Sequence, residues 1–222
     1  MKRFFFLPSY IIYLLVFVNA YSFLFYSWGK TFFIVAFSVA ICLAFRRHKV
    51  PYQETLKPEG EIFLSPVFGT IKSIRENVAI HNENEFGFEI RVAVSFWDPK
   101  GLYLPTTGEV TFLKANKGKK ISRDAEEHAF YGPLEDVSHT NLTLTSRSQS
   151  KISMRFVDSP YGKRPILWLK SGDRGRGAAG FGYYPLGGTL LIYLPKNSDI
   201  LVFESERVIP GETVMASLKD LN

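Results

Sequence analysis

The chain has 222 residues, with 27 Lys and Arg against 21 Asp and Glu, a formal net charge of +6. This length fits one folded domain together with an anchor segment. The basic excess favours an anionic partner, and we expect lipid rather than nucleic acid. The single cysteine, Cys42, lies in an apolar segment, which excludes an intrachain disulfide and a cysteine-based zinc site.

The N-terminal region is strongly apolar, because Lys30 is the one charged residue between Phe4 and Phe45. One helical crossing of a bilayer needs ~20 apolar residues. We therefore expect residues 1–50 to form a membrane anchor of two short helices, about 4–26 and 31–45, which cross the membrane or re-enter it. Basic residues flank both ends: Lys2, Arg3, Arg46, Arg47 and Lys49. The positive-inside rule then predicts a cell (inner) membrane protein with its folded domain on the cytoplasmic side.

Residues 51–222 have the pattern of a mostly β domain. Apolar and polar residues alternate in several short segments, and Gly and Pro separate them, as is typical of strands and turns. The polar run 114–132 is predicted to be a long surface loop. The expected strands are 61–64, 69–75, 87–97, 108–114, 140–146, 151–157, 164–170, 189–194 and 200–206.

Neither the glycine-rich segment 175–180 nor the histidines indicate a nucleotide or metal site. Residues 175–180 match G-x-G-x-x-G, but the sequence after them is a poor helix. No helix N-terminus would therefore face a pyrophosphate, and we expect a glycine-rich loop. Arg174 and Arg176 in this loop are candidates for contact with a lipid head group. The four histidines lack metal-ligand spacing and are expected at the surface, so no metal site is predicted.

The C-terminal part carries the most specific pattern. Residues 181–195 read FGYYPLGGTLLIYLP, and residues 208–216 read VIPGETVMA. With the turn SPVFG at 65–69 and the exit FRRHKVP at 45–51, they resemble the short, membrane-anchored type of phosphatidylserine decarboxylase. The resemblance implies a barrel-sandwich fold akin to lipoyl and biotinyl carrier domains, behind a two-helix membrane hairpin. It also implies a carboxy-lyase whose pyruvoyl group forms when a Gly-Ser bond cuts itself.

Three positions depart from the family pattern. Gly188 stands where the family has the self-cleaving Ser, Phe68 stands where an S-P-A-D-G turn supplies Asp, and Lys100 stands at the His position. The neighbours of the expected cut are Gly187 and Thr189. Glycine offers no hydroxyl to attack the preceding carbonyl, so no pyruvoyl cofactor is expected. Lys100 is either an ordinary turn lysine or a point charge for a lipid phosphate or carboxylate.

Three functions follow from these observations. The first is a membrane-anchored, phosphatidylserine decarboxylase-related protein that is catalytically inactive. It would bind phosphatidylserine or another anionic lipid, or regulate an active relative in a homo- or hetero-oligomer. The second is an active decarboxylase, converting phosphatidylserine to phosphatidylethanolamine after an unusual cut before Thr189. The third is a membrane-anchored lipoyl-like adaptor. No nucleic-acid partner is expected.

Overall fold

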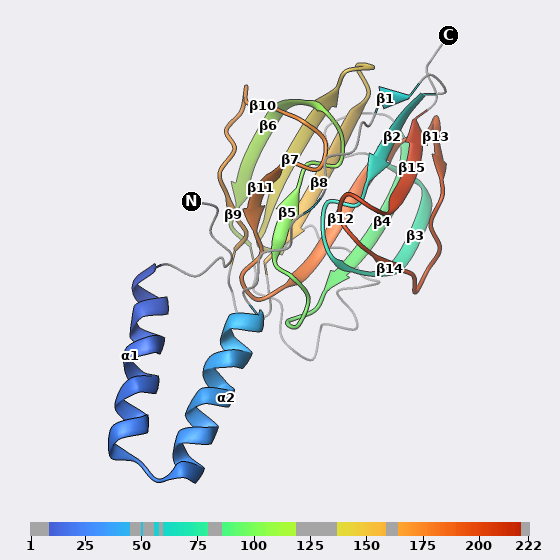
Figure 1. Cartoon of the computed structure of the whole chain (residues 1–222). Helices are drawn as coiled ribbons and strands as arrows, with labels where there is room; N and C mark the ends of the chain where they lie inside the picture. The colour runs from blue at the N-terminus through green and yellow to red at the C-terminus, as the bar shows by residue number, and fades with distance from the viewer. Residues whose placement is uncertain are drawn as a thin grey trace. The chain divides into compact units, whose positions relative to one another are not determined.

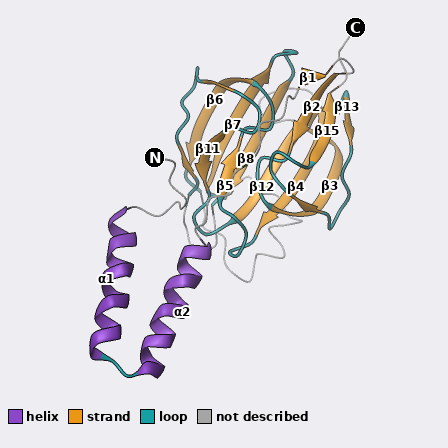
Figure 2. Cartoon of the chain, in the orientation of Figure 1, coloured by secondary structure: helices purple, strands orange, loops and turns teal. Residues whose placement is uncertain are grey.

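The computed structural model describes residues 9–44, 50, 56–57, 60–79, 86–118, 137–158 and 164–218. The chain divides into two compact units, Met1–His48 and Lys49–Asn222. The described part of the first unit is helical and that of the second is built from strands and loops (Figure 2). The chain is therefore mostly β with two N-terminal helices, as the sequence predicts.

The N-terminal unit is a helical hairpin. Helix α1 (Ser9–Phe25) and helix α2 (Trp28–Ala44) are joined by the two residues between them (Figure 1, blue). Asn19 donates a hydrogen bond to the Ser38 hydroxyl at 2.8 Å, and the Thr31 hydroxyl donates to the Ser22 carbonyl at 3.0 Å. The two predicted helices are confirmed, with a tighter turn than expected. Within residues 9–44, neither helix has the combination of length and hydrophobicity that a membrane crossing requires.

The second unit contains three antiparallel sheets. One has the order β1-β2-β15-β13, the largest β10-β6-β7-β8-β12-β4-β3-β14, and the smallest β5-β11-β9 (Figure 1). The strands are β1 (Leu56–Lys57), β2 (Gly60–Leu64), β3 (Gly69–Ala79), β4 (Phe86–Val94), β5 (Gly101–Tyr103), β6 (Gly108–Asn116), β7 (His139–Ser146), β8 (Lys151–Val157), β9 (Ile166–Leu167), β10 (Arg174–Gly175), β11 (Gly180–Tyr183), β12 (Gly188–Pro195), β13 (Ser198–Ile200), β14 (Arg207–Val208) and β15 (Val214–Leu218).

One hydrophobic core unites these sheets. Its members include Phe63 of β2, Phe156 of β8 and Phe181 of β11, all at most 2% exposed. Strand β12 lies between β4 and β8, and both of its faces are buried. Leu190, Ile192 and Leu194 point into the main core, whereas Leu191 and Tyr193 pack into a second cluster with Val157. A strand buried on both faces needs a continuous apolar run, which explains the sequence LLIYL.

Most of the predicted strands are confirmed, and two predictions are wrong. The prediction at 164–170 reduces to the two-residue strand β9, and most of 200–206 is a turn between β13 and β14. His139 is 6% exposed rather than at the surface, because its ring is held between Asn116 and the Val137 carbonyl. Strand β6 extends to Asn116, so the first three residues of the predicted loop 114–132 belong to a strand. Residues 119–132 of that loop lie outside the described residues. The structure does not test the barrel-sandwich assignment.

Candidate functional site

The Gly187–Gly188 turn connects β11 to the central strand β12. Both glycines have positive φ, +75° and +146°, a backbone conformation that side chains with a Cβ rarely adopt. A Cβ on Gly187 would overlap the Val94 carbonyl of β4. A Cβ on Gly188 would lie 2.5 Å from the Tyr184 hydroxyl and 3.0 Å from the Val157 carbonyl. The turn therefore has no space for a side chain at either position.

Tyr184 fills the volume that a side chain at position 188 would need. Its side chain is fully buried, its ring packs edge-on against Phe156 at 6.2 Å, and its hydroxyl donates to the Thr189 carbonyl at 3.4 Å. Burial raises the pKa of this phenol well above its ordinary value, and the nearby Asp158 carboxylate raises it further. Tyr184 is thus a neutral hydroxyl next to the turn, and it cannot serve as a base at ordinary pH.

The sheet register brings the sequence-predicted positions to one end of the fold. Thr189 and Thr70 both pair with Ala93 of β4, from opposite sides, so they lie roughly 10 Å apart across the sheet. Phe68 ends the turn just before β3 and is 7% exposed. The same turn is tied to β5, because the Tyr103 amide donates to the Pro66 carbonyl at 2.9 Å.

Lys100 joins this end of the molecule through its backbone, because its carbonyl accepts the Tyr184 amide at 2.8 Å. Its side chain is 1% exposed, and its ammonium donates to the Ser95 carbonyl at 2.5 Å and lies 5.4 Å from the centre of the Phe96 ring. Burial lowers the pKa of Lys100 to about 8, against an opposing effect of Asp98. The lysine is therefore a structural cation at this end, and its role at a lipid head group stays a prediction.

Two acidic residues near the turn were not identified from the sequence. Asp158 follows β8 directly after Val157, and Arg164 donates to one of its carboxylate oxygens at 3.1 Å. The other oxygen is buried without a hydrogen-bond partner among the described residues. Asp98 accepts from the Ser95 amide at 2.9 Å and from Arg207 at 3.0 Å. Asp158 lies in no motif of the sequence, because the pairing of β8 with β12 brings it beside the turn. Asp98 lies two residues before Lys100.

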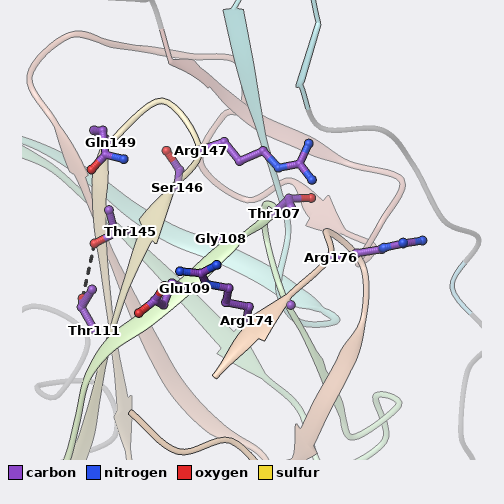
Figure 3. A pocket seen from close by; sticks show the side chains of 11 residues that line it. Thr107, Gly108, Glu109, Thr111, Thr145, Ser146, Arg147, Gln149, Arg174 and Arg176 are labelled. Carbon is purple, nitrogen blue, oxygen red and sulfur yellow. Dashed lines mark hydrogen bonds and ion pairs between the residues drawn. The ribbon is translucent and has the colours of Figure 1, made fainter. Parts of the chain in front are cut away.

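The two arginine candidates lie elsewhere, along an open groove beside β6, β7 and β10 (Figure 3). The groove has a volume of about 720 Å³ and is lined by Arg174, Arg176 and a third arginine, Arg147, that the sequence did not single out. Lys100 does not line it. In the described part of the chain, no group of His, Cys, Asp and Glu could hold a metal ion.

The chemistry available at the Gly188 turn is limited. Phe68 cannot accept a proton, Lys100 is held by a backbone carbonyl, and Gly188 carries no nucleophile. Thr189 has a hydroxyl, but its residue pairs with Ala93 on one side and Val157 on the other, inside the sheet. Among these residues, the turn has the geometry of a packed entry into strand β12.

Similarity to known proteins covers most of the chain. No family model matches it. The phosphatidylserine decarboxylase proenzyme of Symbiobacterium thermophilum is 23% identical over 201 residues, 88% of this chain and 86% of the relative. That of Saccharopolyspora erythraea is 23% identical over 75% of this chain and 70% of the relative. That of Ehrlichia chaffeensis is 26% identical over 81% of this chain and 76% of the relative. The chain is thus similar, over most of its length, to phosphatidylserine decarboxylase proenzymes, and this similarity supports membership of that family.

Proposed function

We propose that this protein acts in phospholipid metabolism as a membrane-associated relative of phosphatidylserine decarboxylase that does not process itself. It would bind an anionic phospholipid such as phosphatidylserine and regulate lipid handling, alone or with an active relative, rather than decarboxylate a lipid. One observation carries the proposal: position 188 is a glycine whose side-chain space is occupied by the buried Tyr184.

The reasoning starts from how a pyruvoyl group arises in this family. A serine hydroxyl attacks the preceding glycine carbonyl, the peptide becomes an ester, and elimination followed by hydrolysis leaves the pyruvoyl carbonyl. The residues at this turn do not fit that group. Gly188 has neither the hydroxyl nor the Cβ from which the group is made, and a Cβ there would lie only 2.5 Å from the Tyr184 hydroxyl.

The membrane part of the proposal is supported by the surface of the helical hairpin. Two hydrogen bonds between the helices join polar groups of Asn19, Ser22, Thr31 and Ser38. Large apolar side chains such as Phe25, Trp28 and Phe33 are 68 to 83% exposed. This arrangement reverses that of a water-soluble helix pair and suits helices that face acyl chains. A hairpin inserted from the cytoplasmic face, with the barrel-sandwich domain on that side, is the arrangement we propose.

The mass of the full chain, extracted from membranes, tests the proposal. We expect one uncut polypeptide of 25.3 kDa. An active enzyme that cuts before Thr189 would instead release the fragment 189–222 with a ketone at its N-terminus, and that product would overturn the proposal. The paired assay measures phosphatidylethanolamine in cells that lack their own decarboxylase. We expect these cells to make no phosphatidylethanolamine, even when the protein is expressed and present in their membrane fraction. Binding of protein partners without lipid binding would indicate the adaptor function instead.

A further inference from the structure

The arginine groove is a concave and polar surface. Its lining combines three arginines with hydroxyl and amide side chains and a single carboxylate, that of Glu109. Glu109 binds Arg174 at 2.7 Å. Figure 3 shows this pair together on one side, Arg147 beside Thr107, and Arg176 extending outward. The full lining is Thr107, Gly108, Glu109, Thr111, Thr145, Ser146, Arg147, Gln149, Arg174, Gly175 and Arg176.

The groove carries uncompensated positive charge. Three guanidinium groups against one carboxylate leave a net charge of +2, since 3 − 1 = 2. Arg147 and Arg176 are exposed, and neither has an ion pair among the described residues of the chain. Two arginines without an ion pair in the described chain, at a concave surface, suit a phosphate ligand. One guanidinium group can donate two parallel hydrogen bonds to two oxygens of a phosphate.

The scaffold under the arginines is held by backbone contacts. Strand β10 pairs with the start of β6, with Arg174 opposite Glu109. The Gly177 amide donates to the Thr107 hydroxyl at 3.0 Å. The turn that carries Arg147 is fixed because Ser148 donates to the buried Glu61 at 2.6 Å. The arginines therefore start from fixed backbone positions, which reduces the ordering that a ligand must impose on the loops.

The groove is distant from the Gly188 turn. Strand β7 runs from His139, which pairs with Val157 near the turn, to Ser146, which lines the groove. These two ends are seven residues apart, roughly 24 Å at ~3.4 Å per residue. A ligand bound at the arginines would therefore not touch the cleavage-like turn.

We propose that the arginine groove is a phosphate-binding site whose ligand is the phosphodiester of an anionic phospholipid head group. The lipid source rests on the proposed function, whereas the phosphate chemistry rests on the groove alone. Arg147 and Arg176 bind the phosphate oxygens, and the Thr107 and Gln149 side chains add polar contacts. Glu109 remains paired with Arg174 and limits the charge of the site.

The test measures binding of soluble probes to the full chain in mild detergent by titration calorimetry. The probes are inorganic phosphate, glycerophosphoserine and a short single-stranded oligonucleotide. The double variant Arg147→Gln/Arg176→Gln should weaken phosphate and glycerophosphoserine binding at least about tenfold, because it removes two charge-assisted contacts. The control, Lys114→Gln/Lys196→Gln, removes the same charge from exposed positions outside the groove and should change binding less than about threefold.

The outcomes separate the ligand sources. Tighter binding of glycerophosphoserine than of inorganic phosphate supports a lipid head group, and the opposite order supports a free phosphate compound at the same site. Absence of binding to the unmodified chain overturns the proposal, as does an equal loss in the control variant. An oligonucleotide that binds the groove more tightly than both small probes overturns it in favour of nucleic acid. A processed chain in the mass measurement would refute the proposed function and leave this binding result intact.

Discussion

Replacing Gly188 by serine restores the hydroxyl that the family pattern has at this position, yet we expect an uncut and destabilised protein. The new Cβ would lie 2.5 Å from the Tyr184 hydroxyl and 2.7 Å from the ring carbon that carries it. Distances this short require Tyr184 or the strand to move. Tyr184 is packed against Phe156 and fully buried, so it has little room to do so.

The cost has two parts. A residue other than glycine at φ +146° is strained by about 1–3 kcal/mol. Overpacking the buried site adds about 1–3 kcal/mol. The sum, roughly 2–6 kcal/mol, is a large share of the ~5–15 kcal/mol by which folded domains are stable. For a chain of this size it lowers the melting temperature by roughly 5–20 °C.

Thermal unfolding of Gly188→Ser, followed by the β-sheet circular dichroism signal, measures this loss. The intact mass of the same sample shows whether the chain is cut. Adding Tyr184→Phe removes the nearest atom in the clash, so the double variant should regain part of the lost stability. A Gly188→Ser variant that melts with the parent protein would refute the steric argument. A chain that cuts itself with this change alone would refute the view that the other two positions also prevent processing.

Three further predictions concern buried groups. Burial lowers the pKa of Lys100 in the folded state to about 8, so folding is disfavoured where the unfolded chain still holds this proton. As pH rises from 8 to 10.5, the unfolding free energy of the parent protein should increase, relative to that of Lys100→Met, by at most about 3 kcal/mol in urea titrations. Glu61→Ala should cost about 1–3 kcal/mol in the same titrations, since it removes the acceptor of the buried Thr106 hydroxyl and one partner of the partly buried Ser148 hydroxyl. Phe156→Ala should cost about 3–5 kcal/mol by opening a cavity beside Tyr184.

Each of these has a result that contradicts it. A difference between the Lys100→Met and parent proteins that stays constant with pH would mean that the lysine is charged and solvated in the folded state. A loss below about 1 kcal/mol for Glu61→Ala would mean that water replaces the carboxylate. The same small loss for Phe156→Ala would mean that the core collapses around the missing ring.

The long strands were predictable because the alternation or continuity of their apolar residues is visible within the segment itself. Segments 151–157 and 189–194 have long apolar or alternating runs, and the structure contains β8 and β12 there. The failures have a different origin. Residues 200–206 contain apolar side chains, but Leu201 and Phe203 are 48 and 77% exposed, and the segment turns to reach β3. Short strands such as β9 and β10 exist only because a partner strand is nearby, a contact that periodicity does not encode.

The candidate site was likewise predictable from the sequence only in part. The departure from the family pattern at position 188 is visible in the sequence, because it changes one position of a motif. Tyr184 is only four residues away, yet its role depends on the turn that folds its ring against Gly188. Asp158 lies 30 residues before Gly188, and Arg147 lies 27 residues before Arg174. The pairing of the strands brings each of them close to its partner in the structure. Residue spacing therefore located the altered motif and not its surroundings.

The three positions that depart from the family pattern in sequence, Phe68, Lys100 and Gly188, are connected to one another in the structure. The Phe68 turn contacts β5, the residue before β5 is Lys100, and the Lys100 carbonyl holds the Tyr184 amide. Tyr184 in turn occupies the space above Gly188. An aspartate at 68 would bury a carboxylate at a position that is 7% exposed. A shorter side chain at 100 would remove the Lys100 donor from the Ser95 carbonyl, which would keep the Asp98 amide at 3.2 Å. Each family residue introduced alone would thus meet packing that suits the residue now present, so we expect single substitutions at 68, 100 or 188 to destabilise the fold rather than to produce self-cleavage.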